Sequence, residues 1–249
     1  MPDTAVDTHA PAALPPLVLV HGAWAGAWAW QRVLAPLRAA GHAVFTVTLS
    51  GCGERRHGLR RDITLQTHVA DVVGLVQAEE LHDVVLVGHS FGGLVVTGAA
   101  DALLAADAAA VRQVVYVDAM VPLPGECWSS RHSDAVKAAR QGAARASGLN
   151  ALPPPDPDGF GLSGADRAWL LRRQGPHPFN AYLEPLHYSA ERLAGVPRGF
   201  IDCTSPAYRP SRRCARGCAR CQASPWSKWR PGTTRRSRIR RPSWRRCGR

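Results

Sequence analysis

The chain has 249 residues, 45% of them hydrophobic, which is the size and composition of one globular domain. Its net charge of +12 is unevenly placed: residues 209–249 hold fourteen arginines, one lysine and no acidic residue, whereas residues 1–208 hold 16 basic and 19 acidic side chains. Cys52, Cys127 and Cys203 are scattered through the longer part, which excludes a disulfide framework, and no apolar run is long enough to cross a membrane.

The first 16 residues are rich in proline and alanine and predict a loose arm. They contain Asp3 and Asp7 but no basic residue, so they lack the charged start and apolar core of a signal peptide. We therefore expect a cytoplasmic protein without a membrane partner.

Short apolar runs alternate with helix-like segments from residue 17 onward, which predicts a mostly parallel sheet with helices on both faces. Strands are expected at residues 17–20, 43–49, 84–87, 113–118 and 199–203, and helices at 28–40, 64–80 and 93–100, with a polar loop at 50–62. Residues 119–195 interrupt this alternation with many prolines and two helical pieces, near 133–146 and 165–173. An insertion of this length predicts a lid over a site.

Five aromatic residues of the expected lid are candidates to line a pocket or to form the lid's own core. They are Trp128, Phe160, Trp169, Phe179 and Tyr182.

A G-x-S-x-G motif consists of Gly88, His89, Ser90, Phe91 and Gly92. An apolar strand precedes it and a helix of small residues follows it, which is the setting of a nucleophile elbow. Glycines two places before and after the serine leave room for the strained turn. The pattern predicts that Ser90 is a catalytic nucleophile.

Serine attack on a carbonyl group requires hydrogen-bond donors for the oxyanion that forms. In an elbow, the first donor is the backbone N–H of the residue after the serine, here Phe91. The second donor comes from the loop after the first core strand, here Ala23 in His21-Gly22-Ala23. The sequence thus predicts an oxyanion hole made of these two amides.

Three segments together resemble the α/β-hydrolase superfamily: LVLVHGAW with WAW at residues 17–30, GHSFGG at 88–93, and VDAMVP at 117–122. More narrowly, they resemble its small esterases related to plant methyl-ester esterases and hydroxynitrile lyases. The resemblance covers about residues 17–208. It implies an α/β-hydrolase fold and hydrolysis of small carboxylic esters through an acyl-serine, with no metal or organic cofactor. The lyase members carry a threonine where this chain has Gly22, which favours esterase chemistry.

The acid of the catalytic triad has two candidates. Family members often place it after the strand expected at 199–203, but residues 204–207 offer no carboxylate. Asp118, at the end of the strand after the elbow, is the preferred candidate. Asp202 is the alternative, although it is expected inside a strand and facing away. A purely structural role for Asp118 also stays open.

The catalytic base is missing from the place where the family has it, near the C-terminus, because no histidine follows His187. His177 and His187 fall in the lid, His89 lies in the elbow and faces the wrong way, and His21 belongs to the oxyanion loop. The chain as written is therefore expected to be impaired in catalysis.

Residues 209–249 do not match the family, and we interpret them as a translated frameshift that begins near residues 208–210. In the shifted frame, residues 230–235 permit Thr-Gly-His-Asp-Ala and residues 236–247 permit an apolar helix. The last strand and helix of the fold would then be missing from this chain.

Two non-enzymatic alternatives remain. The protein would be a hydrolase-fold remnant that binds without turnover, or a nucleic-acid binder whose basic tail contacts phosphates and stacks Trp226, Trp229 and Trp244 on bases. Nucleic-acid binding is the less favoured of these, because arginine-rich composition also arises when GC-rich DNA is read out of frame. The tail cysteines match metal-ligand spacing only weakly.

Overall fold

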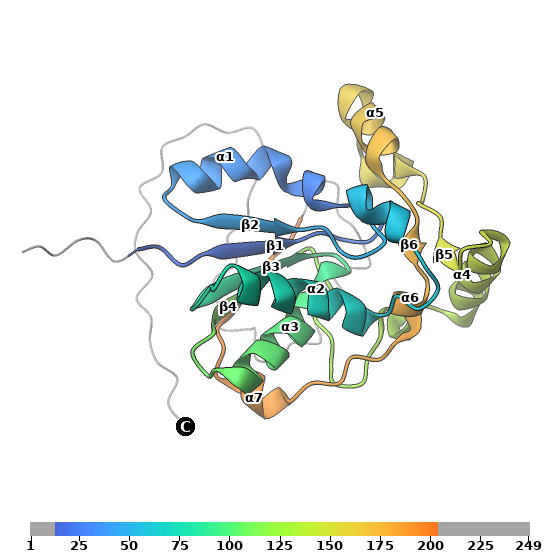
Figure 1. The fold of residues 1–249 in the computed structure, drawn as a ribbon. Helices are drawn as coiled ribbons and strands as arrows, with labels where there is room; N and C mark the ends of the chain where they lie inside the picture. Colours follow the sequence, from blue (N-terminus) through green and yellow to red (C-terminus); the bar gives the residue numbers. More distant parts are fainter. Residues whose placement is uncertain (1–12, 204–249) are drawn as a thin grey trace, which may run out of the picture.

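The computed structural model describes residues 13–203, and it confirms the expected α/β-hydrolase fold class. Five of the described strands form a parallel sheet in the order β2-β1-β3-β4-β7 (Figure 1). The strands are β1 (Leu17–Val20), β2 (Val44–Val47), β3 (Val84–His89), β4 (Val111–Val117) and β7 (Arg198–Ile201). All of them end at the same edge of the sheet, so residues that follow different strands come together there.

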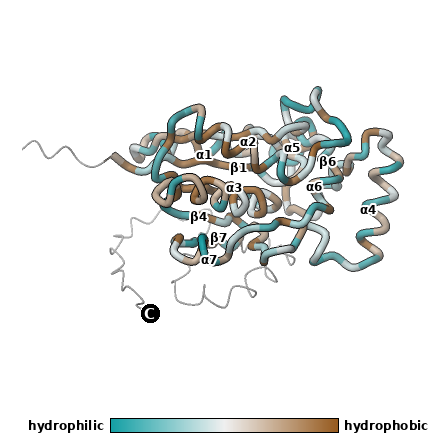
Figure 2. The backbone as a smooth tube through the Cα atoms, turned by 60° about the horizontal axis from the view of Figure 1, so that its bottom comes forward, coloured by the Kyte–Doolittle hydropathy of each residue, from teal (hydrophilic) through white to brown (hydrophobic). Residues whose placement is uncertain are grey.

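Helices cover both faces of this sheet (Figure 1). Helix α1 (Gln31–Ala39) packs on one face through a cluster that includes Leu17, Leu19 and Leu34. Helices α2 (Leu65–Ala78) and α3 (Gly92–Ala106) pack on the other face in the larger core. Because alternate residues of each strand point to opposite faces, continuous apolar strands are buried on both sides. Figure 2 shows this apolar concentration along the strands and α3.

Several element boundaries differ from the sequence-based expectation, and the largest difference is in α3, which continues to Ala106 instead of ending at residue 100. The helix expected at 28–40 starts with a 3-10 turn, Ala27–Trp30, and the loop expected at 50–62 contains a 3-10 helix, Gly53–Gly58. The expectation that Asp202 lies inside a strand is wrong, because β7 ends at Ile201. Asp118 has a positive φ of +44°, so β4 leaves the extended conformation after the last pair of the ladder, and no strand partner remains for Asp202.

The insertion between β4 and β7 lies largely beyond the C-terminal ends of the strands, as expected for a lid (Figure 1). It contains η3 (Trp128–Arg131), α4 (Asp134–Ala146), β5 (Ala151–Leu152), η4 (Pro157–Phe160), α5 (Gly164–Arg173), β6 (His177–Pro178), α6 (Asn180–Leu183) and α7 (Ala190–Ala194). Strands β5 and β6 pair antiparallel, and α7 packs beside α3. Across residues 13–203, no helix combines the length and apolarity of a membrane span. The cytoplasmic location stays a prediction.

The start of α3 packs so tightly that a single methyl group would disturb it. A Cβ on Gly93 would lie 2.1 Å from the backbone O of Met120, whereas a Cβ on Gly74, within α2, would meet nothing within 4 Å. We expect Gly93→Ala to lower the free energy of unfolding by about 3 kcal/mol, because backbone must move. Gly74→Ala should raise it by up to about 1 kcal/mol through helix propensity. Urea unfolding of both variants checks this, and equal effects would contradict the packing argument.

Candidate active site

Ser90 occupies the sharp turn between the end of β3 at His89 and the start of α3 at Gly92. Its φ is +52°, a left-handed conformation that is costly for a residue with a side chain. Such strain persists only where the surrounding structure enforces it, and it is often found at functional sites. The residue expected to be the nucleophile therefore sits in the backbone geometry of a nucleophile elbow.

Close backbone packing explains why the elbow needs glycine on both sides of Ser90. A Cβ on Gly88 would lie 2.5 Å from the backbone O of Gly92. A Cβ on Gly92 would lie 2.8 Å from the backbone O atoms of Val20 and His21. The turn is thus pressed against the end of β1, and larger residues would push it away from the sheet.

The loop after β1 lies directly against the nucleophile. A Cβ on Gly22 would be 3.0 Å from Cβ of Ser90 and 2.9 Å from Nδ1 of His89. The backbone N–H groups of Ala23 and Phe91 donate no hydrogen bond to any residue in the range 13–203. Two unpaired backbone donors beside a strained serine have the chemistry of an oxyanion hole.

Asp118 follows the strand that neighbours β3, so it lies next to the elbow. The N–H of Ser90 donates to the carbonyl O of Val117 at 3.3 Å, and the N–H of Met120 donates to the carbonyl O of Ser90 at 3.0 Å. These two bonds flank Asp118 in sequence and tie its loop to the serine. Like Ser90, Asp118 has a positive φ.

Asp202 follows the next strand outward, β7, and its carboxylate lies near the same edge. The pKa of the Cys203 thiol is raised, first by partial burial and then by the neighbouring carboxylates of Asp118 and Asp202. Both candidate acids are therefore brought to one place, but only Asp118 sits on a strand adjacent to β3.

None of the described histidines stands out as a base for Ser90. The ring of His89 packs edge-on against Trp30, and His187 is exposed. The ring of His177 is fully buried, 4.6 Å from the ring centre of Phe91, and burial lowers its pKa well below the usual value. The histidine that the shifted frame permits falls outside the described residues. Across residues 13–203, no group of three or more His, Cys, Asp or Glu side chains is arranged to hold a metal ion.

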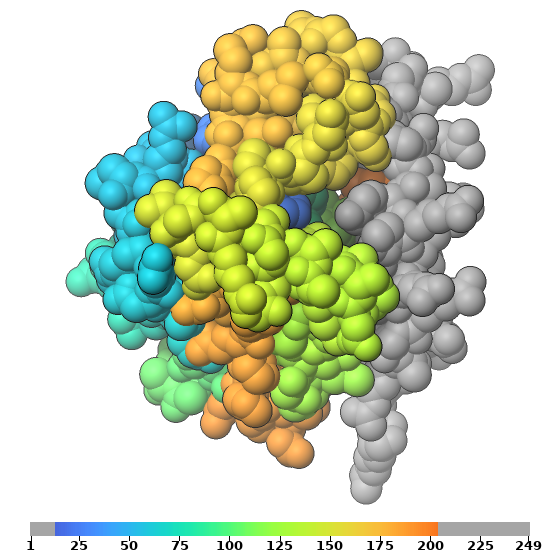
Figure 3. All heavy atoms as spheres, turned by 90° about the vertical axis from the view of Figure 1, so that its right-hand side faces the viewer, coloured from blue at the N-terminus to red at the C-terminus, as the bar shows by residue number. Residues whose placement is uncertain are grey.

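An aromatic cluster connects the lid to Phe91 and to Trp24, the residue after Ala23. The ring of Trp128 lies 5.3 Å from that of Phe91, 5.4 Å from that of Trp24 and 5.1 Å from that of Tyr182. The guanidinium of Arg140 stacks on Trp24, Trp128 and Tyr182 at 4.8 to 5.6 Å. Figure 3 shows a hollow between the lid segments, with atoms from the early part of the chain at its floor.

The expected lid aromatics thus divide into two groups. Trp128, Phe179 and Tyr182 are buried together. Trp169 instead packs on Trp28 at 4.9 Å, and Phe160 is exposed. Sequence spacing could not distinguish the groups, because the path of the lid chain decides which aromatics meet.

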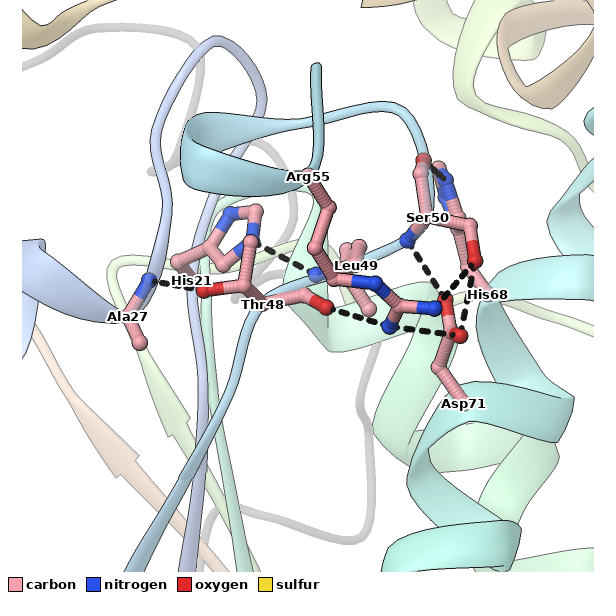
Figure 4. Close-up of polar contacts among 8 residues, drawn as sticks. All are labelled: His21, Ala27, Thr48, Leu49, Ser50, Arg55, His68 and Asp71. Atoms are coloured by element: carbon pink, nitrogen blue, oxygen red, sulfur yellow. Dashed lines mark hydrogen bonds and ion pairs between the residues drawn. The ribbon is translucent and has the colours of Figure 1, made fainter. Parts of the chain in front are cut away.

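A hydrogen-bonded network beside the loop after β1 was not foreseen from the sequence (Figure 4). Both the backbone N–H and the hydroxyl of Ser50 donate to Asp71, at 2.6 and 2.8 Å. Arg55 donates to Asp71 at 3.0 Å and to the carbonyl O of Thr48 at 2.8 Å. This network fixes the segment after β2, which carries Leu49 against the side chain of His21.

The parallel sheet, the strained serine turn and the long insertion define an α/β hydrolase. Consistent with this, the model of the alpha/beta hydrolase family matches residues 17–239, and the chain belongs to that family. The match continues past residue 208, where the resemblance was expected to end, so it includes part of the basic tail.

Most of the similar proteins are esterases by name, and an alpha-hydroxynitrile lyase of Arabidopsis thaliana, 32% identical over 106 residues and covering 42% of this chain and 40% of that protein, is also among them. The carbendazim hydrolyzing esterase of Nocardioides sp. (strain SG-4G) is 41% identical over 192 residues, covering 74% of this chain and 78% of that protein. Methylesterase 1 of Arabidopsis thaliana is 29% identical over 220 residues, covering 79% and 80%. Among solved structures, an extracellular α/β-hydrolase from a Paenibacillus species aligns with a TM-score of 0.68 at 25% identity, covering 77% of this chain and 78% of that one. The predicted resemblance to the esterase branch is confirmed.

Proposed function

We propose that the protein is a serine esterase that acts on small carboxylic esters through an acyl-serine intermediate. The observation that carries this proposal is the strained Ser90 beside the N–H groups of Ala23 and Phe91, which donate no hydrogen bond within residues 13–203. In acylation, Oγ of Ser90 bonds to the ester carbonyl carbon, and the two amides bind the resulting oxyanion. The bond to the alcohol oxygen then breaks and the alcohol leaves. Water releases the acid from the serine in the second half-reaction.

The substrate class follows from the lid and the relatives. The buried ring cluster around Trp128 offers an apolar surface next to the oxyanion residues, which suits the apolar part of a small ester. The similar proteins include, by their names, a carbendazim hydrolyzing esterase and methylesterases. The apolar ring cluster and the names of the relatives both favour a neutral small-molecule ester over a polymer as the substrate.

Asp118 is our candidate for the triad acid, because it follows the strand adjacent to the serine strand and its loop is bonded to Ser90. The base would lie in the C-terminal sequence that the shifted reading frame encodes in place of residues 209–249. Without a base, the hydroxyl proton of Ser90 must pass to water, so the chain as written should acylate slowly.

The proposal is tested by covalent labelling with an alkyl fluorophosphonate followed by peptide mass spectrometry. We expect the adduct on Ser90 in preference to the other serines, because the N–H groups of Ala23 and Phe91 beside it can bind the phosphoryl oxygen. Ser90→Ala should remove this adduct and leave background labelling unchanged. Labelling spread evenly over the serines, or unchanged in Ser90→Ala, would overturn the proposal.

The specific observation that favours a second function, a non-catalytic binder of the same fold, is the absence of histidine after His187. Such a protein would bind small esters or acids in the hollow without labelling at Ser90. The basic tail, the basis for nucleic-acid binding, lies outside the described residues.

A further inference from the structure

We propose that His21 is a positioning residue of the oxyanion hole: its neutral side chain fixes the Gly22–Ala23 peptide so that the N–H of Ala23 faces the site. This inference rests on the proposed function. It gives a role to the side chain of His21, which the sequence analysis had placed in the oxyanion loop without a role of its own.

The hydrogen-bond partners of His21 define its tautomer. Nε2 lies 3.1 Å from the backbone N of Leu49, which can only donate, so Nε2 must be an unprotonated acceptor. The proton then sits on Nδ1, which lies 2.7 Å from the carbonyl O of Gly22 and donates to it. Both ring nitrogens are thereby satisfied in a fully buried ring.

The bond to Gly22 controls the direction of the Ala23 N–H because both belong to one peptide unit. A trans peptide is planar, and its C=O and N–H point in opposite directions. A donor that holds the Gly22 carbonyl from one side therefore directs the Ala23 N–H to the other. A carbonyl that accepts a hydrogen bond also polarises its own peptide, which makes the N–H a stronger donor.

The partner of His21 is itself held on both sides. Ser50, after Leu49, donates two hydrogen bonds to Asp71 on α2. Thr48, before Leu49, accepts a bond from the N–H of Ala27 at 2.8 Å through its hydroxyl. Figure 4 shows this chain of contacts from the helix to His21. The ring is thus oriented by a rigid segment, as a positioning group must be.

The charge state agrees with this role. Burial is the main cause that lowers the pKa of His21 to about 4, and its bond to Gly22 opposes the shift. A protonated ring would direct its Nε2–H at the N–H of Leu49. Two donors would then face each other, and the hydrogen bond between Leu49 and His21 would be lost. The positioning contact should therefore be constant between pH 6 and 9.

Two substitutions separate the two bonds of His21. Asparagine places an amide N–H near the position of Nδ1, so His21→Asn can keep the contact to Gly22. Glutamine places a carbonyl O near the position of Nε2, so His21→Gln can keep only the contact to Leu49. The readout is the rate of Ser90 phosphonylation by the fluorophosphonate, resolved into the maximal rate and the half-saturating concentration. In this reaction the Ser90 oxygen bonds to phosphorus, fluoride leaves and the hydroxyl proton passes to water.

We expect His21→Gln to lower the maximal labelling rate by about 10- to 100-fold at an unchanged half-saturating concentration, since a misdirected donor stabilises the transition state poorly. His21→Asn should stay within a few-fold of the parent. His42→Asn is the matched control, because Nδ1 of His42 also bonds to a backbone carbonyl O, that of Pro15 at 3.0 Å, and this contact lies before β1 and β2 begin. It should leave the labelling rate unchanged. Equal losses in the Asn and Gln variants of His21 would overturn the positioning role.

Nuclear magnetic resonance of the parent chain tests the inference independently of Ser90 reactivity. Long-range ¹H–¹⁵N correlations should show a neutral, Nδ1-protonated His21 at pH 7. An Nε2-protonated or charged ring would overturn the inference. If Ser90 is not labelled at all but this tautomer is present, the proposed function fails while the assigned peptide contact stands.

Discussion

Restoring the alternative reading frame after Tyr208 is expected to raise hydrolysis of p-nitrophenyl acetate by about 10³-fold or more over the chain as written. Removing a triad histidine leaves only the contribution of the oxyanion hole and substrate binding, and its loss typically costs several orders of magnitude in kcat. The chain has no histidine after His187, whereas the shifted frame permits Gly-His-Asp. Sequencing the coding DNA across codons 200–249 locates the base change, and steady-state kinetics on both proteins measure the effect.

Variants of the corrected protein identify which residues produce the gain. Ser90→Ala should abolish it. Asp118→Asn should lower kcat by about 10⁴-fold, as expected when the acid no longer orients the base. Asp202→Asn is the matched comparison at the same sheet edge, and it should have a small effect. A larger loss in Asp202→Asn than in Asp118→Asn would assign the acid to β7 instead. If a correct frame contains no histidine, the esterase proposal reduces to a fold assignment.

Acidification is expected to unfold the protein near pH 5, before most carboxylates are protonated. His21, His68 and His177 are fully buried. Burial lowers the pKa of His21 and His68 to about 4, and that of His177 well below its usual value. In the unfolded chain each ring returns to a pKa of about 6.5, so the unfolded state binds more protons between these limits.

The free energy of unfolding that these neutral rings contribute is fully present above pH 6.5, and it is lost as the pH falls toward 4. His21 and His68 should each contribute a loss of about 2 kcal/mol by pH 5, and His177 adds a loss of the same sign. The sum is a large part of the whole stability of a domain. Urea unfolding at pH 7.5, 6.5, 5.5 and 5.0, followed by tryptophan fluorescence, measures this.

A single substitution tests the cause of the acid sensitivity. His68→Gln removes one of these rings, so the unfolding free energy lost between pH 7.5 and 5.0 should be about 2 kcal/mol smaller than in the parent protein. His187→Gln, at an exposed position, should leave this loss unchanged. A protein whose unfolding free energy is constant from pH 7.5 to 5 would contradict the assignment of three buried neutral histidines.

The sequence alone determined the fold class and the position of the serine turn. Apolar runs such as Leu17–Val20 are typical of strands in a parallel sheet that helices cover on both faces, so the runs by themselves predict such a sheet. The elbow is equally local, because Gly88 and Gly92 are required by contacts within a few residues of Ser90 and with the neighbouring strand. The strand pattern and the serine turn depend on short-range steric contacts, and these can be inferred from the order of residue types along the chain.

Tertiary structure decided what depends on contacts between distant segments. Asp202 lies outside a strand because Asp118, 84 positions earlier in the printed sequence, ends the ladder that would have extended it. Trp128 meets Phe91 and Trp169 meets Trp28 only because of the path that the lid chain takes. The role inferred for His21 depends on an N–H of Leu49, 28 residues away, and a backbone donor has no signature in the sequence. Residue types indicate which chemistry is available, but directional hydrogen bonds between remote backbone groups exist only once the chain has folded.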